Sequence, residues 1–184
     1  MTFKLAFKYL FRLFLLVLLA TSIYLVNLFF MKPFSIDHFL AKETFLEIID
    51  SPESMTYIGI FDKYNWFTGH ASKLTIPSQK QLDRDKAKAR KILETLRSYD
   101  DENLSSIQRA SKKIAIFDTE NTLLRLETFP FHNYVLNQIG GAHIDMVEFM
   151  TDTHPIRNLT EAEAYIDRVR LFDDVFEGHL YELN

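Results

Sequence analysis

Hydrophobic and polar positions divide the chain into one long apolar segment and a series of shorter blocks with helical spacing. The apolar segment covers residues 13–31 and contains no charged residue in 19 positions. At about 1.5 Å rise per residue, a helix of this length covers roughly 28 Å, close to the thickness of the hydrocarbon core of a bilayer. We therefore expect a single membrane-spanning helix within residues 1–34, followed by a body over residues 35–184.

The charges that flank the apolar segment indicate its orientation. Three basic residues precede the segment and one follows it directly, namely Lys4, Lys8, Arg12 and Lys32. Because basic residues concentrate on the cytoplasmic side of a membrane span, the N-terminus is expected in the cytoplasm. The body is then expected on the periplasmic or extracytoplasmic side of the inner (cytoplasmic) membrane.

A cleaved signal peptide is the alternative interpretation of this segment. Ala20 and Ser22 are small enough for a cleavage site, and cleavage would release a secreted body. The apolar run nevertheless continues for nine residues beyond Ser22, where a signal peptidase substrate normally becomes polar. We therefore favour an uncleaved anchor.

The first part of the body carries clear helix boundaries. Ser35 is placed to cap one helix, and Ser51 with Pro52 opens a short second helix that ends at Gly59. Residues 60–77 show no clear period and are expected to form a loop.

Three capping boxes predict the later helices: Ser78 with Gln81, Ser105 with Gln108, and Thr160 with Glu163. The helix after Ser105 has an apolar stripe that is expected to pack: Ile107, Ala110, Ile114, Phe117 and Leu124. Ile116 and Leu123 lie off this stripe, so the helix is expected to pack on two sides. The helix after Thr160 has a similar stripe: Ala162, Tyr165, Ile166, Val169 and Phe172. A short helix is expected at about residues 144–150, and no segment shows sustained strand alternation. The body is therefore predicted to be all-α, with antiparallel helices whose remaining apolar faces need partners.

Composition and charge exclude several classes of function. The 184 residues include no cysteine, which excludes disulfides and cysteine-ligated metal sites. The formal charge is −4, and the basic N-terminal segment leaves the body at −8. A locally basic helix at residues 80–97 is better explained as a solvated face than as a nucleic-acid site, because the acidic body would repel phosphates. We expect no nucleic-acid partner.

Motifs with catalytic chemistry are largely missing from the sequence. It has no phosphate-binding glycine loop, no Gly-x-Ser-x-Gly elbow and no His-Glu-x-x-His pair. Metal-ligand residue types are enriched at His143, Asp145, Glu148, Asp152 and His154, but their spacing matches no known class of site, and a polar helix face is the simpler explanation. Trp66 and Phe67 are expected to plug a core, with ligand or membrane contact as the alternative.

A polar pair near two glycines leaves two interpretations equally open. Asn137 and Gln138 precede Gly140 and Gly141. Their amides can hydrogen-bond a peptide backbone, or they can hold the turn in which they lie.

An ordered series of motifs resembles the N-terminal region of the bacterial domain-of-unknown-function 885 family. The motifs are Ser51-Pro52-Glu53-Ser54-Met55-Thr56 with Gly59, Tyr134 to Asn137-Gln138 and on to His143, His154-Pro155, and Glu163-Ala164-Tyr165-Ile166-x-Arg168. The resemblance covers roughly residues 40–172. Members of that family look like helical, zincin-type metallopeptidases about three times as long as this chain.

The resemblance implies a scaffold without its catalytic part. The presumed zinc motif of the family, His-Glu-x-x-Pro-Gly-His, lies far downstream, so we expect a chain truncated before it, with no catalytic residue and no metal ligand. By analogy, the substrate-cleft candidates are Tyr134, Asn137, Gln138 and His143.

The functional expectation is a membrane-anchored scaffold fragment of a zinc-dependent, peptidase-like hydrolase, inactive alone. No cofactor is expected in this chain, and zinc is expected for the full-length protein. Besides the membrane, the expected partner is the missing C-terminal part or another protein chain. The alternative is a self-standing, membrane-anchored binding or assembly module without enzymatic activity.

Overall fold

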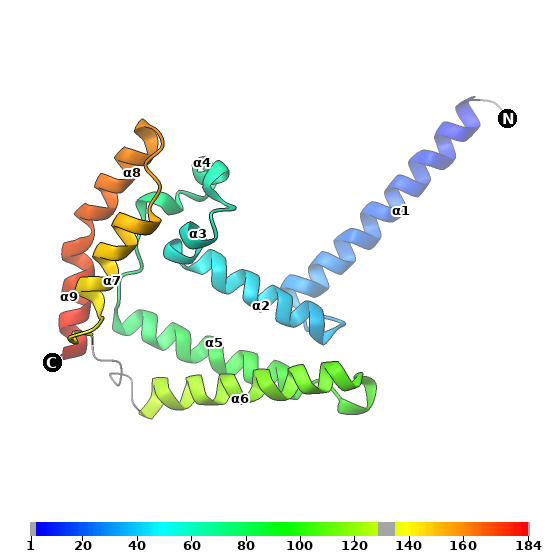
Figure 1. Cartoon of the computed structure of the whole chain (residues 1–184). Coiled ribbons are helices and arrows are strands. Elements are labelled where there is room, and N and C mark those ends of the chain that lie inside the picture. The colour runs from blue at the N-terminus through cyan, green and yellow to red at the C-terminus, as the bar shows by residue number, and fades with distance from the viewer. Residues whose placement is uncertain (1–2, 129–134, 184) are drawn as a thin grey trace.

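The computed structural model describes residues 3–128 and 135–183, which form helices joined by short turns (Figure 1). Within these residues, the extended pairing is limited to one isolated bridge between Leu136 and Gly141. The all-α prediction is therefore confirmed, with one long apolar helix ahead of a helical body.

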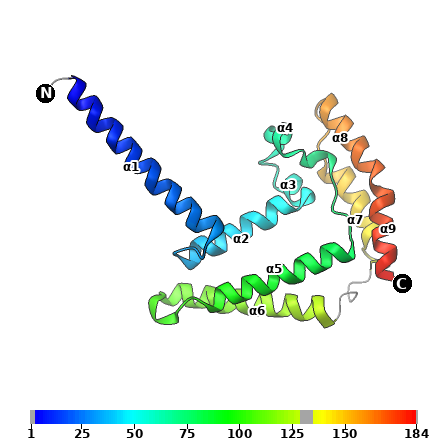
Figure 2. The same ribbon diagram turned by 180° about the vertical axis from the view of Figure 1, so that it is seen from behind.

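The apolar segment forms α1 (Phe3–Phe30), which extends away from the body in both views (Figures 1 and 2). Residues Phe7–Phe30 are long and apolar enough to cross a membrane, a test that an N-terminal signal sequence also passes. Asn27 is buried, and its amide joins the end of α1 to the body. Its Nδ2 donates to the carbonyl of Lys32 at 2.8 Å, and its Oδ1 accepts from the amide of Phe34 at 2.9 Å.

The next two helices begin and end where the sequence predicted. The hydroxyl of Ser35 caps α2 (Ile36–Asp50), and the hydroxyl of Ser51 caps α3 (Pro52–Ile58) by accepting from the amide of Ser54. Gly59 ends α3 at a φ of 68°, the left-handed conformation that glycine adopts without strain.

The expected loop at residues 60–77 is wrong over residues 62–72, which contain short helical turns. They are η1 (Asp62–Tyr64), α4 (Asn65–Thr68) and η2 (His70–Ser72). Turns of three or four residues are too short to show a hydrophobic period, so the sequence pattern gave no signal for them. Local hydrogen bonds hold them instead, including one from the amide of Ala71 to Oδ1 of Asn65 at 3.0 Å.

The longest pair of body helices is an antiparallel hairpin of α5 (Gln79–Arg97) and α6 (Ser106–Thr128), joined through η3 (Asp101–Asn103). Both predicted caps are present. The Ser105 box is reciprocal, with the Ser105 amide donating to Gln108 Oε1 at 3.0 Å and the Gln108 amide donating to Ser105 Oγ at 3.2 Å. Arg90 and Arg97 of the basic helix pair with Glu127 and Glu120 of α6, so part of its positive charge is neutralised within the hairpin.

The stripe expected to pack on α6 is wrong in its direction. Its members face solvent, with exposed fractions of 78% at Ile107 and 69% at both Ile114 and Phe117. The second expected side does pack, because Ile116, together with Ala115, joins the core of Ile36, Phe39, Leu96 and Tyr99. Lys112 fixes this rotation, because its Nζ donates to the carbonyl of Tyr99 and to Asp101 Oδ1, both at 2.6 Å.

The second half of the body contains α7 (Ala142–Glu148), the π-helical segment η4 (Phe149–Thr153), α8 (Leu159–Arg170) and α9 (Phe172–Leu183). They enclose a second core formed by Leu74, Phe149, Met150 and Val175. The figures show α8 running directly into α9 at the end of the body remote from α1 (Figures 1 and 2).

Two expectations for α8 are corrected. Its cap is Asn158, which accepts from the amide of Glu161 at 3.0 Å, so the box assigned to Thr160 and Glu163 lies two residues too late. Its buried face centres on Ala164 and Arg168. Tyr165 and Phe172 of the predicted stripe do pack against the second core, whereas Ile166 and Val169 are exposed. The polar contacts of Arg168, described next, set this rotation.

Candidate functional site

Arg168 is the centre of the second half of the body, since its side chain is fully buried at 0% exposure. Its guanidinium makes four hydrogen bonds of 2.7 to 2.9 Å to three separate segments, and a longer one of 3.4 Å to the carbonyl of Pro52. Nε bonds the carbonyl of Lys73 at 2.9 Å and Nη1 bonds Nδ1 of His154 at 2.7 Å. Nη2 bonds Oγ1 of Thr56 at 2.7 Å and the carbonyl of His70 at 2.9 Å. One side chain thus joins α3, η2, the segment before α8, and α8 itself.

The charge of Arg168 is held by neutral acceptors rather than by a contacting carboxylate. Burial lowers its pKa to about 10, while the nearby carboxylates of Glu53 and Asp62 oppose that shift. The group therefore stays protonated at neutral pH. The ring of Phe149 lies 4.8 Å from the guanidinium carbon, which adds a cation–π contact.

Two buried imidazoles flank this guanidinium. Because the arginine can only donate, Nδ1 of His154 must accept, and the proton of that neutral ring lies on Nε2, which donates to the carbonyl of Glu161 at 3.1 Å. Burial, followed for His70 by the charge of Arg168, holds the pKa of both rings below the ordinary value. Among the residues that the structure describes, Nε2 of His70 has no hydrogen-bond partner and lies 3.7 Å from Asp62 Oδ1.

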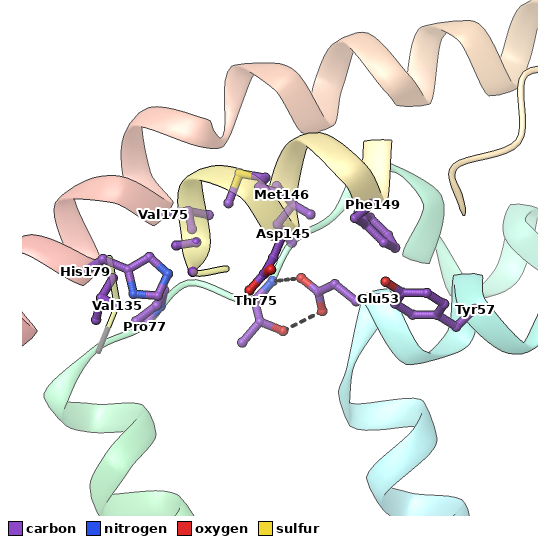
Figure 3. A pocket seen from close by; sticks show the side chains of 13 residues that line it. Glu53, Tyr57, Thr75, Pro77, Val135, Asp145, Met146, Phe149, Val175 and His179 are labelled. Atoms are coloured by element: carbon purple, nitrogen blue, oxygen red, sulfur yellow. Dashed lines mark hydrogen bonds between the residues drawn. The ribbon is translucent and has the colours of Figure 1, made fainter. Parts of the chain in front are cut away.

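A pocket of about 530 Å³ lies beside this cluster, between α3, α7 and α9 (Figure 3). Its walls are largely apolar, with Leu74, Met146, Phe149 and Val175 among the lining side chains. Its polar groups are Glu53, Tyr57, Thr75, Asp145 and His179. In Figure 3 Tyr57 and His179 lie at opposite ends of the pocket, with the two carboxylates between them.

Glu53 is held firmly in the pocket wall. Its Oε1 accepts from the amide of Thr75 at 2.6 Å and its Oε2 accepts from the Thr75 hydroxyl at 2.8 Å. The hydroxyl of Ser51 donates to the same Oε2 at 3.2 Å. Glu53 thereby fastens the extended segment after η2 to the start of α3 and presents a fixed negative charge to the pocket.

Close backbone contact shapes two further parts of the wall. Gly141 has a φ of 112°, and a Cβ placed there would lie 2.5 Å from the carbonyl oxygen of Val135. At Gly178, a Cβ would collide with the carbonyl oxygen of Pro77, so α9 approaches the pocket rim closely only because residue 178 has no side chain.

Of the predicted cleft residues, the three that the structure describes, Asn137, Gln138 and His143, do not line the pocket. Tyr134 lies outside the described residues. Asn137 holds its own turn, because its Oδ1 accepts from the amides of Ile139 at 2.9 Å and Gly140 at 2.7 Å. Gln138 and His143 are exposed. The neighbouring Val135, Gly141 and Ala142 do line the pocket, so their role in a cleft stays a prediction.

The sequence cluster of metal-ligand types separates in space. Asp145 lines the pocket, whereas His154 is buried against Arg168. Among residues 7–128 and 135–180, no group of three or more His, Asp or Glu side chains is placed to hold a metal ion. The described residues therefore do not fit a zinc site.

Sequence reasoning missed the chemical importance of Arg168, Glu53 and Thr75. Arg168 entered only as part of a family motif, because an arginine on a helix is ordinarily exposed. Glu53 was visible as an acidic residue in a first helical turn. Nothing in the sequence marked Thr75, which reaches Glu53 across 22 positions.

The motifs of the family resemblance meet in this unit, since Thr56, His154 and Arg168 are in direct contact. Comparison with family models gives a match over residues 52–184 to the family described as "Bacterial protein of unknown function (DUF885)". No curated protein and no solved structure matches the chain. Since the match covers most of the chain, the protein belongs to the DUF885 family.

Proposed function

We propose that the protein is a membrane-anchored helical scaffold whose pocket forms one wall of a peptide-binding cleft in a peptidase-like hydrolase. The observation that carries the proposal is the convergence of the family motifs on the unit of pocket and buried arginine. Thr56, His154 and Arg168 hold the wall, while Glu53 and Val135 line it. Side chains that are kept rigid behind an open, largely apolar pocket suit binding of an extended ligand.

The chemistry of the pocket favours a peptide with apolar side chains and a cationic group. Met146 and Phe149 offer apolar contact, and the carboxylates of Glu53 and Asp145 attract an amine. The scaffold supplies binding and orientation. In the proposal, the catalytic groups and the zinc of the family come from a further part of the protein or from another chain, so no chemical step runs through the described residues.

The membrane part of the proposal follows from α1. The charge bias around residues 13–31 supports an inner-membrane anchor with the body on the extracytoplasmic side. Secretion after cleavage of a signal peptide is the competing outcome. The length of the mature chain in a membrane fraction, measured by intact-mass spectrometry, distinguishes the two.

Peptide binding is tested on the full chain in lipid nanodiscs. The Met146→Trp variant fills the pocket, and Val147→Trp is its matched control, because Val147 is the next residue on α7 and is 53% exposed. A fluorescent peptide library with lysine and leucine residues is titrated by anisotropy. We expect Met146→Trp to weaken binding at least about tenfold, a loss of roughly 1.4 kcal/mol, with no change in the control.

Two results would overturn this function. Equal binding by both variants would show that the peptide does not bind in the pocket. Zinc-dependent hydrolysis of the library by the purified chain would show that the described residues are more than a scaffold.

A second candidate function is an anchored assembly module without enzymatic activity. The exposed stripe on α6 favours it, since Ile107, Ile114 and Phe117 present a continuous apolar face. A stable oligomer of the chain in nanodiscs that dissociates with Ile114→Asp would support this module. A monodisperse monomer would count against it.

A further inference from the structure

A second apolar surface lies at the α4 end of the body, away from the pocket. Its aromatic members are Trp66 and Phe67 of α4, exposed at 84% and 80%, and Tyr64 of η1, exposed at 57%. Ile156 and Leu159, at the start of α8, are exposed at 57% and 75%. We call these five residues the aromatic patch. The expectation that Trp66 and Phe67 plug a core is therefore wrong.

The fold holds the aromatic patch in place without using its rings. Oδ1 of Asn65 accepts from the amide of Ala71, and Gly69 ends α4 at a φ of 58°. The Thr68 hydroxyl contacts Nδ1 of buried His70 at 2.7 Å. An ion pair of 2.6 Å between Arg157 and Asp62 ties the segment before α8 to η1. The patch is thus a positioned surface rather than a loose loop.

The joint between α1 and the body decides which side of the body faces a membrane. Besides the Asn27 hydrogen bonds, Nζ of Lys32 donates to the carbonyl of Ser98 at 2.7 Å. The hydroxyl of Tyr99 donates to the carbonyl of Pro33 at 2.7 Å, and the Tyr24 ring packs edge-on against His38. These contacts set the direction in which α1 leaves the body. In both views α1 and α4 lie on the same side of the α5–α6 hairpin (Figures 1 and 2).

We propose that the aromatic patch is a second membrane contact, which rests in the interfacial layer of the bilayer that α1 spans. Trp and Tyr concentrate at that layer, where an apolar ring and a polar edge are both accommodated. The nearby carboxylates of Asp62 and Glu161 both pair with Arg157, which reduces their repulsion of anionic headgroups. The other exposed apolar face, on α6, lies across the hairpin from this side and is left for protein partners.

This inference rests on the membrane-anchor part of the proposed function and not on peptide binding. Two contacts, α1 and the aromatic patch, would fix the tilt of the body over the membrane. A single anchor, joined to the body through a short connection, would constrain the tilt of the body less than two contacts do.

Trp66 is the only tryptophan of the chain, so its fluorescence reports directly on the patch. The full chain is reconstituted into vesicles of phosphatidylcholine and phosphatidylglycerol, with or without lipids brominated on the acyl chain near the headgroup. We expect blue-shifted emission, at least about twofold quenching by brominated lipid, and protection from aqueous iodide. The Ile156→Asp variant is expected to reduce the lipid quenching, whereas Ile114→Asp on α6 leaves it unchanged.

A relocated reporter provides the matched control. The double variant Trp66→Phe, Phe117→Trp places the tryptophan on the exposed stripe of α6, where we expect quenching by iodide and none by lipid. Extraction with alkaline carbonate tests α1 independently. Release of the chain overturns the anchor and the patch together. If the chain is retained and Trp66 is quenched by iodide but not by brominated lipid, the membrane contact of the patch is overturned and the anchor stands. The same holds if neither agent quenches Trp66, because protein then covers it.

Discussion

Replacement of Arg168 by methionine is expected to lower the free energy of unfolding by about 3 kcal/mol. Methionine fills much of the same space, so the change removes the donors and leaves only a small cavity. The guanidinium makes four hydrogen bonds of 2.7 to 2.9 Å. Two of its acceptors keep other partners, because the Thr56 hydroxyl also donates to Pro52 and the carbonyl of His70 also accepts from the amide of Lys73.

The carbonyl of Lys73 and Nδ1 of His154 are then the groups that lose their partner. A buried polar group without a partner costs roughly 1–3 kcal/mol, which gives about 2–6 kcal/mol for the two. Removal of the cation recovers part of its desolvation penalty, the same effect that lowers the pKa of Arg168. The net expectation is therefore near the lower half of that range.

The measurement is thermal unfolding of the full chain in detergent, followed by circular dichroism. For a protein of this size, 1 kcal/mol corresponds to roughly 2–4 °C, so we expect Arg168→Met to lower Tm by about 6–12 °C. Arg170→Met is the control on the same helix, because that side chain is exposed and pairs only locally with Asp167. Its expected effect is within about 0.5 kcal/mol. Equal Tm values for the parent and Arg168→Met would refute the assignment of Arg168 as the centre of the body.

Three further results are expected. Burial in the folded state holds the pKa values of His70 and His154 below 6.5, so their contribution to stability is fully present above pH 6.5 and falls as the pH decreases below that value. Denaturant midpoints measured at about pH 7.5 and 5.5 check this expectation, and equal midpoints would contradict it. Asn137→Ala should speed hydrogen exchange of the Ile139 and Gly140 amides by about tenfold, whereas Asn137→Asp, which keeps the acceptor oxygen, should preserve their protection. Equal exchange in both variants would show that the Asn137 side chain does not hold the turn. Asn27→Ala should remove the acceptor of the Phe34 amide, so that this amide exchanges faster and the distance distribution between spin labels on α1 and α5 becomes broader. Unchanged distances would show that the joint does not depend on Asn27.

The sequence predicted elements well where a local signal existed. Ser35, Ser51, Ser78 and Ser105 all cap the helices that their spacing indicated. Helix caps involve residues only two or three positions apart, so their physics is contained in a short stretch of sequence.

The rotation of helices about their axes was predicted only in part. On α6 the largest apolar residues face outward, because Lys112 and small Ala115 determine which side approaches its neighbours. On α8 the buried face includes a charged residue, Arg168, which a count of apolar positions assigns to the surface. These outcomes depend on partners dozens of positions away, and a hydrophobic period carries no information about them.

The candidate site was only partly within reach of the sequence. The motifs around Ser51 and Asn137 pointed to the correct region, since their members Glu53, Val135 and Gly141 line the pocket. The rest of the lining includes distant groups such as Thr75 and Val175, which no motif indicated. Which member of a motif faces a pocket depends on packing between elements, which the spacing of residues does not specify.

The contacts of Arg168 also have a consequence for the order in which the chain folds. Its acceptors on Lys73, His70 and Thr56 lie 95, 98 and 112 positions earlier in the sequence. Closing loops of that length is slow compared with the formation of a helical hairpin such as α5–α6, whose residues are near neighbours. During synthesis the hairpin can therefore form early, whereas the pocket wall stays unassembled until α8 has emerged. Until then these acceptors hydrogen-bond to water, which the guanidinium of Arg168 replaces when α8 packs against α3 and η2.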